Sequence, residues 1–400
     1  MNLIISCISA LDRLGHVKMN NEIVHALKSI RPDLSISSYA LAIDDKYVDL
    51  NSNAQPIDAG YGSKLYTLEN KRLLFLRFQA LGKFIFSIYR MYIGIRYYYR
   101  LYKLIKTADV LIDLEFEPIF SVIFHLLKQK VPFKSHLCVV HSFPNGKESG
   151  FKLLYKNISL YILKLYVKKS SIIGLMTEED LATARSRGFE EHQIVLVGWG
   201  LEQKRFNPNK HSLIDKSISS STNFLMAGTL RKDKEIEKVI RLFHEISIPE
   251  FRLLIAGYPV DVKISSLEKI ISDLELDNSI KVIGRYFSDQ EFNQLFIDCD
   301  VVVLSHSSQF YSMSGPLLMA LEMGKPILCL SSNSVSKLVA DLGAGLLLHL
   351  EETHNIKAIK EQLRVLKDMD YKIPDEFMFS WNTITKRCLA SLKLLDMDIS

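Results

Sequence analysis

The residues best suited to hold an anion follow an apolar run at residues 223–227. Gly228 ends that run and allows a tight turn, and Arg231 and Lys234 lie three residues apart just after it. Two cations beside the free amides of a helix start can clamp a diphosphate. The segment GTLRKDK therefore predicts a phosphate site, although an ordinary solvated basic turn would use the same residues.

A second stretch of this kind is YSMSGPLLMALEMGKP at residues 311–326, which follows another apolar run. It leads into a predicted helix at residues 316–323, so Ser312, Ser314 and Gly315 lie where a helix N-terminus would meet an anion. Serine hydroxyls and the unobstructed amide of glycine suit a phosphate group. A helix cap without a ligand is the alternative, because serine is a common N-cap residue.

Candidate acid and base groups follow predicted strands in the first half of the chain. His141 ends the apolar run LCVVH, and Glu117 comes shortly after the run DVLIDL. Asp12 lies with Gly15 in the loop that follows the first apolar run. A general base must reach the hydroxyl that it deprotonates, and the ends of parallel strands open toward ligand sites. We take His141, Glu117 and Asp12 as the catalytic candidates; a solvated loop or strand end is the alternative for each.

The scaffold for these residues is predicted from short apolar runs that alternate with helical patterns. A chain of 400 residues exceeds one ordinary core, so we expect two domains. The alternation indicates α/β domains, each with a parallel sheet covered on both faces. The predicted strands are residues 3–9, 109–114, 137–141, 171–176, 193–197, 223–227, 252–256, 280–283, 301–304, 326–330 and 345–348.

A polar, serine-rich segment at residues 210–223 separates the two alternating patterns. We expect a first domain at residues 1–205, a second at residues 206–375 and a C-terminal helix within residues 376–400. The segment of residues 379–400 has an amphipathic helical pattern.

The composition is that of a globular protein, with 48% hydrophobic and 24% charged residues. The five cysteines are odd in number and lack zinc-site spacing, which indicates a reduced, cytoplasmic protein. The N-terminus has no basic region of the signal-peptide type, and no run reaches about 18 apolar residues. We therefore expect neither a signal peptide nor a membrane-spanning helix.

Residues 70–108 carry many Lys, Arg, Phe and Tyr side chains but no Asp or Glu. A basic, aromatic helical surface suits an anionic membrane interface. Interleaved basic and aromatic side chains could also bind single-stranded nucleic acid. Alternatively, the aromatic side chains could pack into the core, with the basic ones outside. The one-sided charge favours membrane contact, and residues 152–169, with Tyr155, Tyr161 and Tyr166, are expected to extend the same face.

The second half of the chain resembles the nucleotide-sugar-binding domain of GT-B glycosyltransferases of group 1, the family 4-like type. The segments that match, in the order of the family, are GTLRKDKEIEKVIRLF, LLIAGYP, IKVIGRYFSDQEFNQLFIDCDVVVLSHSS, SGPLLMALEMGKPIL and GAGLLL. The terminal FSWNTITKR resembles the final helix, which crosses back to the first domain, and the first half resembles the family more loosely. The resemblance implies an α/β fold of two Rossmann-like domains facing a cleft, with a C-terminal crossover helix.

The resemblance also implies roles for individual residues. Arg231 and Lys234 match the basic pair that holds the diphosphate of the donor, and Ser314 and Gly315 match the small residues under the phosphates. His141 matches a histidine that lies near the sugar in many relatives. The expected donor contacts are Gly15, Gly228, Arg231, Lys234, Arg285, Tyr286, Tyr311, Ser312, Ser314 and Gly315.

The sequence departs from the family at one motif. Many retaining members carry two glutamates separated by seven residues before the Gly-Lys-Pro turn, and those positions here are Tyr311 and Met319. Neither side chain can accept hydrogen bonds as a carboxylate does. An inverting enzyme would instead need a general base on the acceptor side.

The function implied by the resemblance is transfer of a sugar, of the hexosyltransferase type, from a nucleotide sugar to a glycan or lipid-linked acceptor. Residues 1–205 would bind the acceptor at the cytoplasmic membrane face, and residues 206–375 the donor, in surface polysaccharide synthesis. We expect no cofactor and no metal, because no convincing Asp-x-Asp pair adjoins a small-residue loop. The partners would be the donor, the acceptor and an anionic membrane surface, without nucleic acid. A non-hydrolysing sugar-nucleotide epimerase and a non-catalytic binding scaffold are the alternatives.

Overall fold

The chain forms two compact units, which we describe separately. Unit 1 comprises residues 1–200 and 379–400, and unit 2 comprises residues 201–378, a division close to the expected boundaries at 205/206 and 375/376. The computed structural model describes residues 1–7, 16–42, 54–58, 79–105, 108–119, 135–141, 143, 150–167, 171–200, 221–246, 251–307, 314–330, 334–348, 356–371 and 380–394.

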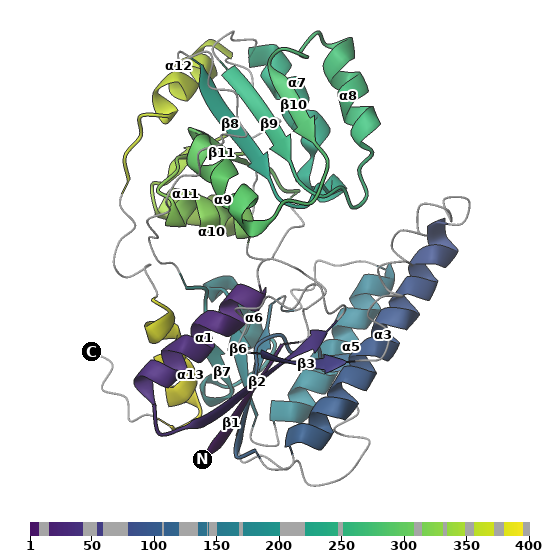
Figure 1. Ribbon diagram of the computed structural model, residues 1–400, viewed down its shortest axis with the longest axis vertical. Coiled ribbons are helices and arrows are strands. Elements are labelled where there is room, and N and C mark those ends of the chain that lie inside the picture. Colours follow the sequence, from purple (N-terminus) through teal and green to yellow (C-terminus); the bar gives the residue numbers. More distant parts are fainter. Residues whose placement is uncertain are drawn as a thin grey trace. The chain divides into compact units, whose positions relative to one another are not determined.

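The described residues of unit 1 contain seven parallel strands in the order β3-β2-β1-β4-β5-β6-β7 (Figure 1). Apolar runs such as SHLCVV in β5 form the central strands because a parallel sheet buries both of its faces. The strands are β1 (Asn2–Cys7), β2 (Ser35–Ala42), β3 (Ala54–Asp58), β4 (Val110–Asp113), β5 (Ser135–Val140), β6 (Ser171–Leu175) and β7 (Ile194–Leu196).

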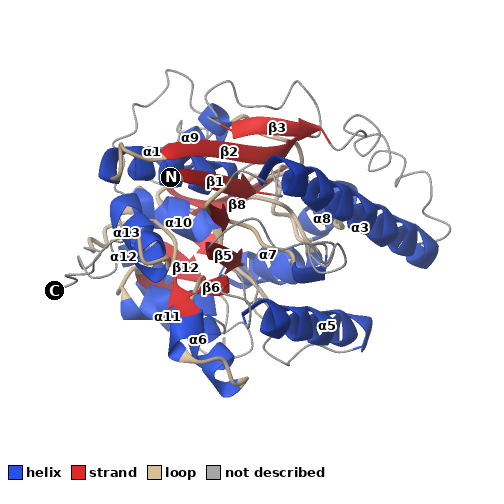
Figure 2. Cartoon of the chain, turned by 90° about the horizontal axis from the view of Figure 1, so that it is seen from below, coloured by secondary structure: helices blue, strands red, loops and turns tan. Residues whose placement is uncertain are grey.

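Helices cover both faces of this sheet. Alternate strand residues point to opposite sides, so Ile4 belongs to the core beneath one helix set and Leu3 to the core beneath the other. The first set contains α3 (Gln79–Leu104) and α5 (Gly150–Val167), and the second contains α1 (His16–Ile30) and α13 (Trp381–Ser391), as Figure 2 shows. The other helices among the described residues of this unit are α6 (Glu178–Ser186) and the 3-10 helix η3 (Glu191–Gln193).

The C-terminal helix α13 packs on unit 1, as the crossover expectation requires. Trp381 at its start is buried, and its ring meets that of Trp199 edge-on at 5.9 Å between centroids. A Cβ on Gly200 would overlap the Trp381 ring, so a glycine allows the chain to pass this close. The end of the chain therefore returns to complete the core of the first unit.

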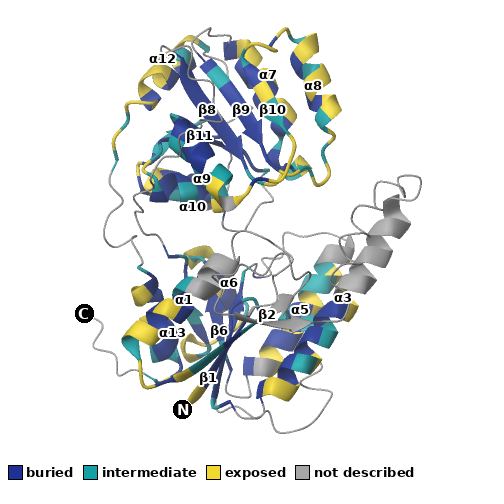
Figure 3. Ribbon diagram, viewed as in Figure 1, coloured by how far each residue is buried: buried dark blue, intermediate teal, exposed yellow. Residues whose placement is uncertain are grey.

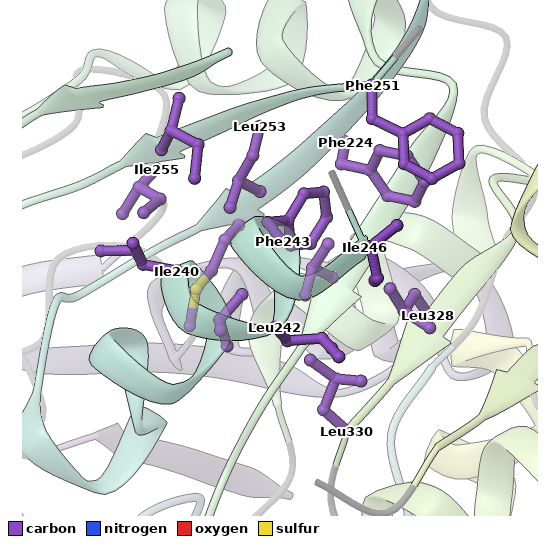
Figure 4. Packing of buried hydrophobic residues seen from close by; sticks show 14 of the residues in the cluster. Phe224, Ile240, Leu242, Phe243, Ile246, Phe251, Leu253, Ile255, Leu328 and Leu330 are labelled. Carbon is purple, nitrogen blue, oxygen red and sulfur yellow. The ribbon is translucent and has the colours of Figure 1, made fainter. Parts of the chain in front are cut away.

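Unit 2 contains, in its described residues, six parallel strands in the order β10-β9-β8-β11-β12-β13. Phe224 packs edge-to-face against both Phe243 and Phe251 (Figure 4), and the four central strands are almost wholly buried (Figure 3). The strands are β8 (Thr222–Ala227), β9 (Phe251–Ala256), β10 (Ile280–Ile283), β11 (Val301–Leu304), β12 (Ile327–Cys329) and β13 (Gly345–Leu347). The helices are η4 (Lys232–Lys234), α7 (Ile236–Ile246), α8 (Ile264–Asp273), α9 (Asp289–Asp298), α10 (Gly315–Glu322), α11 (Ser334–Asp341) and α12 (Ile356–Leu366).

The strand order reverses direction once in each sheet, between β1 and β4 in unit 1 and between β8 and β11 in unit 2. Ligands of open α/β sheets bind outside the carboxyl ends of the strands at such a switch point. The residues that follow β8 and β11, and those that follow β4, are therefore the first places to look for a site.

Candidate functional site

The turn after β8 places a buried lysine at the switch point of unit 2. Gly228 has a φ of +98°, which a residue with a side chain rarely adopts, and it turns the chain sharply at the strand end. The Lys234 side chain folds back beneath this turn and donates from Nζ to the Ala227 carbonyl at 2.9 Å. Lys234 is only 5% exposed. An ammonium has three N–H donors, so two remain for other acceptors.

The local structure around Lys234 differs from the expected helix start. Arg231 precedes η4, a single 3-10 turn, and Glu235 then has a left-handed φ of 48° before α7 begins at Ile236. Because Glu235 breaks the helical path, the two cations do not share the first turn of an α-helix. The expectation of a helix N-terminus at Arg231–Lys234 is therefore wrong in this detail.

Arg231 lies in a different setting from Lys234. Its guanidinium donates from Nε and Nη2 to the two carboxylate oxygens of Asp233 at 3.0 and 2.9 Å, and both side chains are partly exposed. A bidentate pair of this kind fixes the orientation of the guanidinium. The expected basic pair thus consists of one buried ammonium and one oriented, accessible guanidinium.

The N-terminus of α10 lies against the same turn. Ser314 is the N-cap, and its hydroxyl accepts a hydrogen bond from the Leu317 amide at 3.4 Å. A Cβ on Gly228 would lie 3.1 Å from Lys234 Nζ and 3.2 Å from Pro316 Cγ. Gly228 therefore adjoins both the buried ammonium and the first turn of α10. Gly315, at the start of α10, is exposed. The positive end of the α10 dipole and the charge of Lys234 thus both lie next to the Gly228 turn.

A second glycine lets β9 approach this turn. Gly257 follows β9, and a Cβ on it would overlap the carbonyl oxygen of Gly228. We expect Gly257→Ala to lower the free energy of unfolding by about 2 kcal/mol or more, since the strand ends must separate. Urea unfolding of the full chain measures this loss of stability. Gly315→Ala, whose new Cβ meets nothing within 4 Å, should change stability by no more than about 0.5 kcal/mol. Equal losses in the two variants would contradict the close approach.

The residues after β11 complete the switch point and were not singled out from the sequence. Ser305 and His306 are both buried, and the Ser307 amide donates to the Asp233 carbonyl at 2.7 Å, which ties this strand end to the 3-10 turn. Burial, together with the smaller effects of the nearby charges of Lys234 and Arg231, lowers the pKa of His306 to about 3. His306 is therefore a neutral neighbour of the two cations. Its position directly after an apolar strand was the signal available in the sequence.

Burial also affects Lys234 itself. Desolvation lowers its pKa to about 8, with a smaller lowering by Arg231, so the ammonium is charged at pH 7 and loses its proton as the pH rises past 8. A bound diphosphate favours the charged form and raises the pKa. Affinity for a sugar nucleotide should therefore fall between pH 7 and 9, by up to about tenfold per pH unit above 8. Titration calorimetry across this range measures the slope, and Lys234→Met should remove it. A slope that persists in Lys234→Met would assign the titration to another group.

The loop after β10 holds Arg285 and Tyr286. Arg285 pairs with Glu291 at 2.7 Å between Nη2 and Oε1, and its guanidinium lies 4.1 Å from the centroid of the Phe287 ring. The Arg285 hydrogen bond, followed by the amide of Ser288, lowers the pKa of Glu291 to about 2. Tyr286 is exposed. Arg285 is thus held by protein partners at the edge of the sheet, and Tyr286 is open to solvent beside it.

In unit 1, the turn after β4 contains the acid candidate Glu117 in a network of hydrogen bonds. Tyr98 on α3 donates to Asp113 Oδ2 at 2.8 Å, and its hydroxyl accepts from the Glu117 amide at 3.1 Å. The Glu117 carboxylate accepts from the Tyr155 hydroxyl on α5 at 2.9 Å. Burial raises the pKa of Asp113 to about 7. Two helices thus fix the turn that carries Glu117, and the sequence pattern did not single out Tyr98, Tyr155 or Asp113.

His141 follows β5, the strand next to β4. Its Nε2 donates to the Leu114 carbonyl at 2.7 Å, because a carbonyl only accepts, and its ring meets Trp199 at 6.5 Å between centroids. Leu114 begins the turn that leads to Glu117, so His141 and Glu117 adjoin the same turn. The structure brings these two candidates together at the carboxyl end of the unit 1 sheet.

Four of the predicted site residues lie outside the described residues: Asp12, Gly15, Tyr311 and Ser312. Met319, at one of the two glutamate positions of the family motif, is half-buried on α10. In the described part of the chain, no group of three or more His, Cys, Asp and Glu side chains is arranged to hold a metal ion.

Comparison with known proteins relates this geometry to a family. Residues 214–377 match the model of the family described as glycosyl transferases group 1. No curated protein sequence matches the chain significantly.

The chain is also similar to solved structures, and this likeness in fold covers both units. Anabaena HepE in complex with UDP and glucose has a TM-score of 0.65 and 15% identity, with 99% of this chain and 100% of that chain covered. Sucrose-phosphate synthase from Thermosynechococcus elongatus has a TM-score of 0.61 and 13% identity, with coverage of 98% and 95%. UDP-GlcNAc 2-epimerase from Methanocaldococcus jannaschii has a TM-score of 0.59 and 13% identity, with coverage of 98% and 99%.

Sequence identities this low show only that the folds are alike. The family model, by contrast, matches the unit that contains Gly228, Lys234 and α10. Both sheets have the strand order of Rossmann-like domains, and α13 returns to unit 1. Residues 214–377 are therefore similar to the glycosyl transferases of group 1, in a chain whose two Rossmann-like units have the GT-B fold.

Proposed function

We propose that the chain transfers a sugar from a nucleoside-diphosphate sugar to a glycan or lipid-linked acceptor. The observation that carries the proposal is the contact of three elements at the switch point of unit 2. The buried Lys234 ammonium, the Gly228 turn and the N-terminus of α10 adjoin one another. Fixed positive charge and free amides suit a diphosphate, and they would offset the charge that develops on it as it leaves.

On the acceptor side, we propose that Glu117 or His141 takes the proton from the acceptor hydroxyl. Both adjoin the turn after β4, and a carboxylate or imidazole is the usual general base. Because Tyr311 and Met319 replace the paired glutamates, this base would support an inverting reaction. We further propose that transfer needs no metal, since Lys234, Arg231 and the α10 amides would supply the positive charge.

The experiment is a thermal-shift panel of UDP-, GDP-, TDP- and CMP-sugars in buffer with EDTA, followed by NMR of the product formed with the donor that binds. A donor present at 100 times its Kd stabilises the native state by about 2.7 kcal/mol. We expect one nucleotide class to raise the Tm and its sugar to be transferred. No shift with any donor, or binding only when Mn²⁺ is added, would contradict the proposal.

A sugar-nucleotide epimerase is the second candidate, and the likeness to UDP-GlcNAc 2-epimerase is the observation that favours it. The two functions differ in their products. Incubation of the donor alone would yield an epimeric sugar from an epimerase, whereas a transferase needs an acceptor to consume the donor at its full rate.

A further inference from the structure

Large apolar side chains are exposed mainly on two helices of unit 1. Surface apolar residues scattered singly are ordinary in soluble proteins, but a gathered set marks an interaction surface. Among the described residues, most of the large exposed apolar side chains belong to α3 and α5: Met91, Tyr92, Tyr99, Leu104, Leu154, Ile158, Tyr161 and Leu165.

The four on α5 form one row along the helix. Leu154, Ile158, Tyr161 and Leu165 are spaced by four, three and four residues, which aligns them on one face. Leu154 is 55% exposed and Tyr161 is 65% exposed. The other face of α5 already packs Ile162 and Leu163 into the core. This second apolar face, which we call the α5 row, is therefore additional to the one that the fold requires.

The outward face of α3 combines aromatic rings with cations. Arg96 lies over the Tyr92 ring at 5.7 Å and Lys103 over the Tyr99 ring at 4.5 Å. These four residues have the same helical spacing as the α5 row. Tyrosine rings beside long basic side chains are typical of surfaces at a water–lipid boundary, because each has an apolar body and a polar tip.

The charge on both helices has one sign. Neither α3 nor α5 contains an Asp or Glu, and each contains several Lys or Arg. By contrast, α6 of the same unit begins with Glu178, Glu179 and Asp180. Both α3 and α5 cover the same face of the unit 1 sheet (Figure 2), so one planar, anionic partner could meet both. Phospholipid bilayers with anionic head groups have that charge and an apolar layer beneath it.

We propose that the outward faces of α3 and α5 bind an anionic lipid bilayer, with the α5 row entering the boundary between head groups and acyl chains. The cations Arg96, Lys103 and Lys164 would meet the head groups. This deepens the proposed function, because it places the acceptor side of the enzyme at a lipid surface. It also narrows the expected membrane contact, because Tyr97 and Tyr98 of the basic-aromatic segment are core residues whereas Tyr161 of the extension at residues 152–169 is exposed.

The inner faces of the same helices hold the acceptor-side turn. Tyr98 of α3 and Tyr155 of α5 both hydrogen-bond to Glu117, one at its amide and the other at its carboxylate. A bilayer bound to the outer faces would thus lie against the elements that fix the proposed general base. This arrangement fits an acceptor that carries a lipid.

The test measures co-sedimentation of the full chain with vesicles of phosphatidylcholine alone and of phosphatidylcholine with phosphatidylglycerol. The variant is Ile158→Glu with Tyr161→Glu, two exposed positions whose change should leave the fold intact. The control is Val365→Glu on α12, which is 67% exposed. We expect the double variant to bind anionic vesicles about tenfold or more weakly than the unchanged chain and the control to bind as the unchanged chain does.

Three results would overturn the proposal. These are equal vesicle binding by the double variant and the unchanged chain, no preference for anionic over neutral vesicles, and a dimer that dissociates in the double variant without any vesicle binding. The last would assign the α5 row to a second copy of the chain. Donor-induced Tm shifts, measured on the same samples without lipid, should be unaltered in the double variant. Loss of the lipid surface and failure of the donor site are therefore distinguishable.

Discussion

Replacement of Lys234 by methionine should lower kcat/KM for the sugar nucleotide by about 10²–10³-fold. Methionine nearly matches the length and volume of the lysine stem but carries no charge. The buried ammonium, fixed by the Ala227 carbonyl, contacts the turn where the diphosphate would lie. The ammonium therefore needs no reorganisation to stabilise a departing diphosphate, and its removal should raise the activation free energy of transfer. Steady-state kinetics with the donor identified by the thermal-shift panel measures the effect.

The matched control for this variant is Lys232→Met, in the same 3-10 turn. The Lys232 side chain is exposed, and its backbone makes the local hydrogen bonds: the amide donates to Asp261 Oδ1 at 2.8 Å and the carbonyl accepts from the Glu235 amide at 3.1 Å. The control removes the same net charge from the same segment. We expect it to change kcat/KM by less than about threefold, because exposed charges are screened by solvent. Equal losses in both variants would show that general electrostatic attraction, rather than a fixed ammonium, accounts for donor use.

The second large effect is expected from Glu117→Gln, which should lower kcat by about 10²–10⁴-fold. Glutamine keeps the shape of glutamate and can still accept the hydrogen bond from Tyr155, but it cannot take a proton. The KM for the donor should be unchanged, because the donor would bind in unit 2. Single-turnover assays with a saturating donor separate this chemical step from donor binding.

Two comparisons distinguish a catalytic carboxylate from a structural one. Tyr155→Phe removes one hydrogen bond to the Glu117 carboxylate but keeps the carboxylate, so kcat should fall much less. His141→Asn tests the other base candidate in the same turn. If Glu117→Gln retains full kcat while His141→Asn loses it, the base is His141. Loss of stability in Glu117→Gln with an unchanged kcat would assign Glu117 to packing alone.

The central strands of both sheets were predictable because burial on two faces requires continuous apolar runs. Residues 223–227 lie within β8, and residues 301–304 match β11. The strands β2 and β3 were missed, since SISSYALA is largely polar or small and AQPID contains Pro56. Proline lacks an amide donor and is tolerated at a sheet edge, where β3 lies. Polar strands of this kind, at or next to a sheet edge, are recognised by their sheet partners rather than by their own composition.

The candidate site was predictable where residue type and chain position suffice, as for Gly228, Lys234 and Ser314. Contacts between distant segments were not. Tyr98 and Tyr155 looked like two among many aromatic residues on basic helices, and only the fold brings both hydroxyls to Glu117. Likewise, Arg231 and Lys234 looked equivalent. A left-handed residue at Glu235 and a carboxylate at Asp233 give them different environments, which spacing alone does not reveal.

Hydrogen–deuterium exchange of the full chain with and without the bound sugar nucleotide is the most direct test of the donor site. The amides of residues 228–235 and 314–317 adjoin the proposed diphosphate position, so a donor held there should slow their exchange. Those of α12 should exchange as before, because that helix lies away from the carboxyl ends of β8 and β11 (Figure 1). Protection of both segments is the result expected. A donor that binds yet leaves residues 228–235 and 314–317 unprotected would contradict the account.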